Sequence, residues 1–238
     1  MKKTIALTVL AAALALAGAG RAQVLVNAGF INKNASVITT KVSNDSTYSD
    51  WQNIGKGFYV GFGYNFDIWK GIGVAPAVYF NYGKHSEAYS ETFGGVDYNY
   101  TAWLKTMDLN IPLLITYKYE FWYDLLVGSV YVGPVFQMGL SSKGERVRTV
   151  LDEVEATPLD YYAADSNGWT KHTKYDLGIM IGTGFQAYGA RFDIGYTFGI
   201  LERSGEGIKD GKYESIIMGQ FFVGLGYSFD PFPKRRKR

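Results

Sequence analysis

The chain of 238 residues contains no cysteine and only two histidines, His85 and His172. The absence of cysteine excludes a disulfide framework, a thiolate metal site and a lipid anchor on an N-terminal cysteine. Two histidines also argue against a His-rich metal centre. The sequence therefore predicts neither a bound metal ion nor another cofactor.

An excess of charge of one sign is also lacking. The formal net charge is +2, and the basic residues are concentrated at the two ends of the chain. Without Lys2, Lys3 and Arg21 the net charge is −1, and without the five basic residues at 234–238 as well it is −6. The body of the chain is mildly acidic, so nucleic acid is not expected as a partner.

The N-terminus has the pattern of a secretory signal peptide. Lys2 and Lys3 precede an apolar run over residues 5–17 and a small-residue region over residues 18–22. The run is below the ~20 residues that a membrane helix needs, so cleavage is expected, either after Ala22 or at the earlier Ala-Gly-Ala site. The predicted division is a signal peptide (1–22), a barrel domain (23–229) and a basic periplasmic tail (230–238).

Glycine and aromatic residues are abundant: the chain has 29 Gly, and aromatic residues make up 16% of it. From Tyr175 to Phe185, large apolar residues alternate with small or polar ones, and the alternation resumes from Phe192 to Ile200. A strand sends alternate side chains to opposite faces, so this region predicts two antiparallel strands joined by a tight turn. One aromatic face opposite a glycine-rich face is typical of a transmembrane barrel.

Eight such alternating segments follow the signal peptide. They cover residues 24–31, 58–68, 72–82, 104–119, 126–140, the two strands between 175 and 200, and 216–229. Each is about as long as the ~9–11 tilted residues that a membrane strand needs, and an even number lets the sheet close on itself. Pro76, Pro112 and Pro134 each remove a ladder donor, so we expect them at bulges or near strand ends.

The connections between these segments alternate in length. The short ones are 67–71, 120–125 and 187–189, and the long ones are 32–57, 83–103, 141–174 and 202–215. Outer-membrane barrels have short periplasmic turns and long extracellular loops in this order. The sequence therefore predicts an all-β fold, an eight-stranded antiparallel up-and-down transmembrane β-barrel in the outer membrane of a Gram-negative bacterium.

Three stretches resemble the small outer-membrane β-barrel family of Bacteroidetes that is often labelled PorT-like or "porin family". They are Asn110–Tyr119 (NIPLLITYKY), Tyr131–Phe136 (YVGPVF) and Tyr175–Phe185 (YDLGIMIGTGF), and the Ala22-Gln23 context is similar too. The resemblance covers nearly all of the predicted mature chain. It implies a barrel without active-site motifs, and one branch of the family belongs to a protein-secretion system.

The C-terminus departs from that family. Its barrels usually end at an aromatic residue, here Phe229, whereas this chain continues through Asp230-Pro-Phe-Pro to five basic residues at 234–238. We expect this tail to be a solvated end.

Polar residues on the predicted inward face are expected to fill the lumen with hydrogen bonds and ion pairs. The predicted network consists of Asp108, Lys118, Gln137, Asp176, Arg191 and Asp193, with Asn27, Asn65, Asn81, Asn110 and Gln220 nearby. We expect Arg191 to be held by Asp176 or Asp108, two carboxylates near Asp193. An eight-stranded lumen is just wide enough for side chains, so a narrow channel is the less favoured alternative.

Aromatic residues near strand ends are expected to lie at the membrane–water interfaces. These predicted anchors are Trp69, Trp103, Trp122, Tyr227 and Phe229. In the connection 141–174, Tyr161, Tyr162 and Trp169 lie among mixed charges and predict a partner-binding loop, with packing over the barrel mouth as the alternative.

The function that these patterns favour is non-enzymatic, with no catalytic residues. A structural or interaction role is expected, as an accessory to protein secretion or envelope assembly. The expected partners are outer-membrane lipid and lipopolysaccharide, the outer-membrane assembly machinery and an envelope protein. One alternative is a lipid-modifying enzyme that uses His85 or His172 near the rim, although Ser86 is a poor partner for its neighbour His85. The other is a periplasmic lipocalin-like carrier whose aromatic face lines a cavity.

Overall fold

The computed structural model describes residues 21–41, 46–121, 126–151, 153–163, 172–203 and 212–229. The tail and all but the last two residues of the predicted signal peptide lie outside these ranges, and so do Trp122 and Trp169. The division into signal peptide, barrel and tail therefore stays a prediction. No helix among the described residues is long and apolar enough to cross a membrane.

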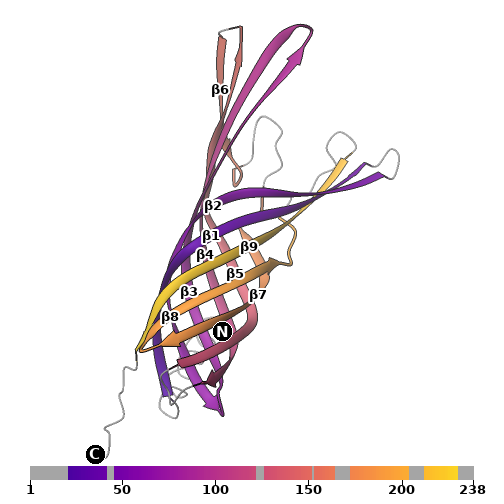
Figure 1. Ribbon diagram of the computed structural model, residues 1–238. Helices are drawn as coiled ribbons and strands as arrows, with labels where there is room; N and C mark the ends of the chain where they lie inside the picture. Colours follow the sequence, from indigo (N-terminus) through magenta and orange to yellow (C-terminus); the bar gives the residue numbers. More distant parts are fainter. Residues whose placement is uncertain are drawn as a thin grey trace, which may run out of the picture.

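Nine antiparallel strands make up the described chain, and eight of them form a closed ring (Figure 1). The strands are β1 (Arg21–Lys41), β2 (Ser46–Trp69), β3 (Ile72–Phe93), β4 (Val96–Glu120), β5 (Leu126–Val150), β6 (Glu153–Asp160), β7 (Tyr175–Ala187), β8 (Ala190–Gly199) and β9 (Lys212–Phe229). β1 pairs with β2 and β9, β4 pairs with β5, and β6 pairs with β5 alone, outside the ring. The predicted eight-stranded antiparallel barrel is confirmed.

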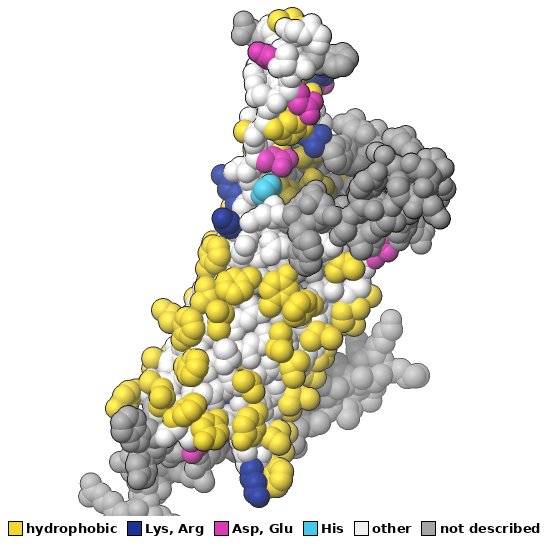
Figure 2. Space-filling model, turned by 45° about the vertical axis from the view of Figure 1, so that its right-hand side comes forward, with side chains coloured by type: hydrophobic (Ala, Val, Ile, Leu, Met, Phe, Trp, Pro, Cys, Tyr) yellow, Lys and Arg dark blue, Asp and Glu magenta, His cyan; other side chains and the backbone are white. Residues whose placement is uncertain are grey.

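The outward face of the ring is apolar, as the alternation predicts. Phe62 is 61% exposed, Ile115 59% and Leu225 69%, and Figure 2 shows such side chains as a broad band across one face of the barrel. Exposed apolar area on this scale is stable against acyl chains and costly against water. The lipocalin-like alternative is contradicted, because it requires the aromatic face to line the interior.

The long connections were expected to be loops, and most of their described residues are strand instead. β3 and β4 continue to a two-residue turn at Gly94 and Gly95, both with positive φ as this kind of hairpin turn requires. β5 continues to Val150 and then pairs with β6. These extensions lie beyond the apolar band, where both faces of a strand meet water. Their sequences therefore show no alternation of apolar and polar residues. Backbone pairing alone extends the strands.

The three prolines also differ from expectation, because they lie inside their strands without a bulge. β3, β4 and β5 keep the same register on both sides of Pro76, Pro112 and Pro134. The ladder is interrupted on one side of each proline, while Pro134 still faces Ile179 on the other side. Each proline thus removes one donor toward a single neighbour, and the remaining pairs hold the register.

A charge introduced into the outward face tests whether lipid covers it. Replacing Ile115 with Arg is expected to lower the free energy of unfolding by roughly 2–4 kcal/mol, because Arg is expensive near the bilayer midplane. Urea unfolding of the barrel in phospholipid vesicles measures this change. Ile115→Leu is the control and should be nearly neutral; an Arg variant as stable as the Leu variant would contradict a lipid-covered face.

Candidate functional site

The lumen is crossed by ion pairs that match each cation with one carboxylate among the described residues. The four pairs are Lys118–Asp67, Arg191–Asp193, Lys33–Asp108 and Arg203–Asp176. A charge taken out of water is tolerated when it is paired and hydrogen-bonded, as these are. The lumen is therefore filled and close to electrically neutral.

Arg191 and Asp193 form a bidentate pair. Arg191 Nε donates to Asp193 Oδ2 at 2.6 Å and Nη2 donates to Oδ1 at 2.7 Å, and both side chains are buried. The sequence predicted Asp176 or Asp108 as partners of Arg191, and that is wrong. Residues two apart on one strand share a face, so the carboxylate beside Arg191 on β8 reaches it first.

A second cluster lies around Asp108 on β4. Lys33 from β1 pairs with Asp108 and also donates to Thr106 Oγ1 at 3.0 Å. Asn81 on β3 donates to Asp108 Oδ1 at 2.8 Å and to Gln220 Oε1 at 3.3 Å. These bonds tie β1, β3, β4 and β9 together across the lumen.

Arg203, which the sequence analysis did not single out, closes the lumen at the end away from the short turns. Its Nε donates to Asp176 Oδ2 at 3.0 Å, and its Nη2 donates to Gln137 Oε1 at 3.3 Å. The Leu201 amide donates to Asp176 Oδ1 at 3.2 Å, so the chain after β8 turns inward over the mouth. Arg203 lies past the end of the apolar alternation, where no sequence pattern distinguishes a plug residue from a loop residue.

Lys118 and Asp67 close the opposite end of the lumen. Lys118 Nζ lies 2.8 Å from Asp67 Oδ1 and donates to Gln23 Oε1 at 2.7 Å. The structure thus places the six predicted lumen residues in four separate clusters. They do not form one continuous network.

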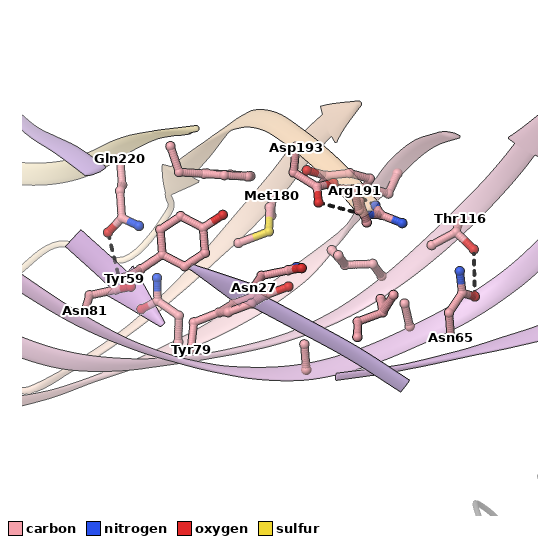
Figure 3. Close-up of a pocket in the computed structure, with 17 residues that line it drawn as sticks. Asn27, Tyr59, Asn65, Tyr79, Asn81, Thr116, Met180, Arg191, Asp193 and Gln220 are labelled. Atoms are coloured by element: carbon pink, nitrogen blue, oxygen red, sulfur yellow. Dashed lines mark hydrogen bonds and ion pairs between the residues drawn. The ribbon is translucent and has the colours of Figure 1, made fainter. Parts of the chain in front are cut away.

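Between the clusters lies a cavity of about 30 Å³ (Figure 3). Its lining includes Asn27, Asn65, Tyr79, Arg191 and Gln220. This volume suits one or two water molecules and is far below the ~300 Å³ of the smallest usual ligand pockets. Among the described residues, this cavity therefore provides no space for a substrate of ordinary size.

Glycines on nearby strands make room for the large inward side chains. The Tyr131 ring lies against Gly182, Tyr59 lies against Gly224, and Asn27 lies against Gly226. A side chain with a Cβ at any of these glycines would collide with that neighbour. The glycine-rich face of the sequence thus lets the lumen close.

The predicted interface aromatics occupy two levels. Trp69, Tyr227 and Phe229 are 62%, 52% and 45% exposed near the short turns. Trp103 lies near the other end, where its Nε1 donates to Glu145 Oε2 at 3.3 Å and Lys105 Nζ lies 5.0 Å from its ring.

Of the predicted partner-loop residues, Tyr161 and Tyr162 lie at the mouth of the barrel. The His172 amide donates to the Tyr161 carbonyl at 2.8 Å, and the rings of these two residues are 4.8 Å apart. The Thr173 amide donates to the Arg203 carbonyl at 3.1 Å. Tyr161 thus packs against His172 at the mouth of the barrel, and partner binding by Tyr161, Tyr162 and Trp169 stays a prediction.

The two histidines lie in different surroundings. His85 Nε2 is 3.6 Å from Glu87 Oε2, while Ser86 points to the opposite face of β3. Burial lowers the pKa of His172 to about 4, and the guanidinium of Arg203 adds to this effect. No group of three or more potential metal ligands occurs in the part of the chain that the structure describes.

Beyond the lipid-facing band, four strands continue as one sheet, which we call the blade. It consists of residues 84–93 of β3, 96–105 of β4, 143–150 of β5 and all of β6, and it projects far from the barrel (Figure 1). Tyr89 and Tyr100 stack at 4.8 Å, and Arg148 lies 5.1 Å from the Tyr98 ring. Val154 on β6 is 67% exposed.

No family model matches the chain, and no curated protein matches it either. Among solved structures, it is similar to the outer membrane protein OprG from Pseudomonas aeruginosa, with 11% identity, TM-score 0.44, and coverage of 89% of this chain and 97% of that one. It is also similar to Ail, the attachment invasion locus protein of Yersinia pestis, with 12% identity, TM-score 0.32, and coverage of 88% and 99%. These likenesses concern the fold alone.

Removing one partner of the bidentate Arg191–Asp193 pair tests whether the stability of the barrel depends on it. Asp193→Asn leaves the Arg191 guanidinium buried without a carboxylate, so we expect a loss of about 3–5 kcal/mol in the free energy of unfolding. The double variant Arg191→Met with Asp193→Leu removes both charges and should recover most of this loss. Equilibrium unfolding in vesicles measures both variants. A single variant that loses less than about 1 kcal/mol, like an exposed pair, would contradict the role of this ion pair.

The segment at the mouth in which His172 bonds to Tyr161 should open more readily in acid. When this segment is open, His172 takes up a proton below pH about 6.5. When the segment is packed, His172 takes up a proton only below pH about 4. The free energy of opening should therefore fall by about 3 kcal/mol as the pH drops between these values, and stay constant above and below them. Hydrogen exchange of the His172 and Thr173 amides, corrected for intrinsic rates, measures it. His172→Gln should abolish the dependence and His85→Gln should keep it; a dependence that survives His172→Gln assigns it to another group.

Proposed function

We propose that this protein is an outer-membrane barrel with a non-enzymatic role, which presents the blade to an envelope or secreted protein outside the membrane. The observation that carries the proposal is the contrast between the two ends of the molecule. The lumen is sealed by paired side chains, while an ordered sheet extends well beyond the lipid-facing band. The blade does not help to close the barrel, and contact with another molecule would explain why the chain forms it.

The filled lumen weighs against a conduction path. Ion pairs close both ends, and the cavity between them is small. The histidines weigh against hydrolysis, which needs an imidazole beside a hydroxyl and an orienting acid. His85 lies beside Glu87 with Ser86 on the other face, and His172 is held against Tyr161.

The finer assignments rest on the sequence. The predicted signal peptide and the apolar outward face support the outer membrane as the location. The three stretches that resemble the PorT-like family of Bacteroidetes support membership in that family and a role beside a protein-secretion or envelope-assembly system. The proposed function therefore includes the outer-membrane location, membership in that family and the role beside such a system.

Photo-crosslinking from the blade in living cells tests the interaction role. A benzoylphenylalanine at Tyr89 or Val154 should give a discrete protein adduct, because both side chains are exposed on the projecting sheet. The same probe at Trp69, at the short-turn end, is the matched control and should give none of this adduct.

Planar bilayer recordings of the purified protein complete the test. A sealed lumen predicts no stepwise conductance. Regular conductance steps, together with no adduct from either blade position, would replace the interaction role with a channel.

A further inference from the structure

Four lysines lie side by side where the lipid-facing band gives way to the blade. Lys56 on β2 is directly opposite Lys84 on β3, Lys84 is opposite Lys105 on β4, and Lys105 is opposite Lys143 on β5. All four are exposed. Neighbouring strands are about 4.8 Å apart, so this lysine row spans about 14 Å across four adjacent strands.

The lysine row faces the lipid side of the barrel. Thr106 points inward to Lys33, so its neighbours Lys105 and Met107 point outward. One step toward the short turns on the same face come Phe58, Tyr82 and Met107, and the rings of Phe58 and Tyr82 are 5.3 Å apart. Figure 2 shows basic side chains at the upper border of the apolar band. The row therefore lies at the height of lipid headgroups.

Carboxylates compensate this charge only in part. Lys143 Nζ is 3.9 Å from Asp160, a long contact for a side chain that is 70% exposed. Lys105 lies over the Trp103 ring, and Glu145 on the same face accepts from Trp103. Within the described ranges, Lys56 and Lys84 have no carboxylate partner. Like charges directly opposite one another on a sheet are destabilising, so an anion bound from outside the chain would stabilise the row.

We propose that the lysine row is a binding site for the phosphate groups of lipopolysaccharide in the outer leaflet. The orientation with the short turns in the periplasm puts the row at the outer leaflet. There the abundant lipid carries two phosphates on a disaccharide headgroup, which suits a row several lysines long better than a single charge. Acyl chains of the same molecule would lie on Phe58, Tyr82 and Met107, directly below. Trp103 adds an amphipathic ring at headgroup level.

The site goes beyond the proposed function, because lipid binding at the row needs no partner on the blade. Lipid binding at the row would also hold the base of the blade at a fixed height above the membrane. The β2–β5 side of the barrel, from which the blade rises, carries the row, and β1 has Asn32 opposite Lys56.

Binding of defined lipids to the full-length protein in phosphatidylcholine nanodiscs tests the site. The probes are bisphosphorylated lipid A, the same lipid A without phosphates, and phosphatidylglycerol. The protein should bind bisphosphorylated lipid A at least tenfold more tightly than either of the others, and less tightly as salt rises. The variant with Lys56, Lys84, Lys105 and Lys143 all changed to Gln should bind it roughly 100-fold more weakly, since each basic residue near an anionic surface contributes.

Two matched variants separate charge from fold. Changing the same four lysines to Arg keeps the charge and should keep the affinity. Changing Lys234, Arg235, Arg236 and Lys237 to Gln removes the same charge from the tail and should leave the affinity unchanged. If the Gln variant fails to fold, two other measurements decide whether the site exists. They are the affinity of the Arg variant for bisphosphorylated lipid A and the salt dependence of that affinity in the natural protein. Equal affinity for lipid A with and without phosphates, or an unaffected Gln variant, would overturn the site. Equal affinity for phosphatidylglycerol would overturn its assignment to lipopolysaccharide.

Discussion

The hydrogen-bonding demand of a backbone in hydrocarbon is the constraint on which the structure depends. Each unpaired amide or carbonyl in the bilayer costs several kcal/mol, so the sheet must close. The β1–β9 seam closes it, with Val24 opposite Phe229 at one end and Lys41 opposite Lys212 at the other. The three prolines of β3, β4 and β5 are tolerated because the pairs around them keep the register. Once the ring is closed, outward side chains meet lipid and inward side chains must fill a narrow space.

That narrow space explains the composition of the inward face. Large side chains such as Tyr131 lie flat over glycines of the next strand, and the charges that remain are matched in pairs. A lumen filled in this way contributes stability and fixes the relative positions of the strands, and it leaves only a small cavity among the described residues. Both of the interactions that we propose therefore lie outside this filled lumen, in the blade and in the charged border beneath it.

The sequence placed the lumen residues correctly on one face but could not identify all of their partners. Strand alternation puts Arg191, Asp193 and Asp176 inward, because each strand has a period of two. Which carboxylate meets which cation depends on the tilt of the strands and on the chain after β8. Arg203 was therefore identified only in the structure. There it pairs with Asp176, while Arg191 pairs with Asp193. The lysine row was hidden for the same reason, since its members are far apart in the chain.

By itself, the sequence determined the closed antiparallel barrel, its lipid-facing side and its eight ring strands, because lipid on one face imposes an apolar pattern that can be read locally. The tertiary structure decided where the strands end, which ions pair, and that β6 joins β5 outside the ring. Beyond the bilayer both faces of a strand are wet, so no pattern marks its length. Neighbours across strands are set by register, which no single strand records.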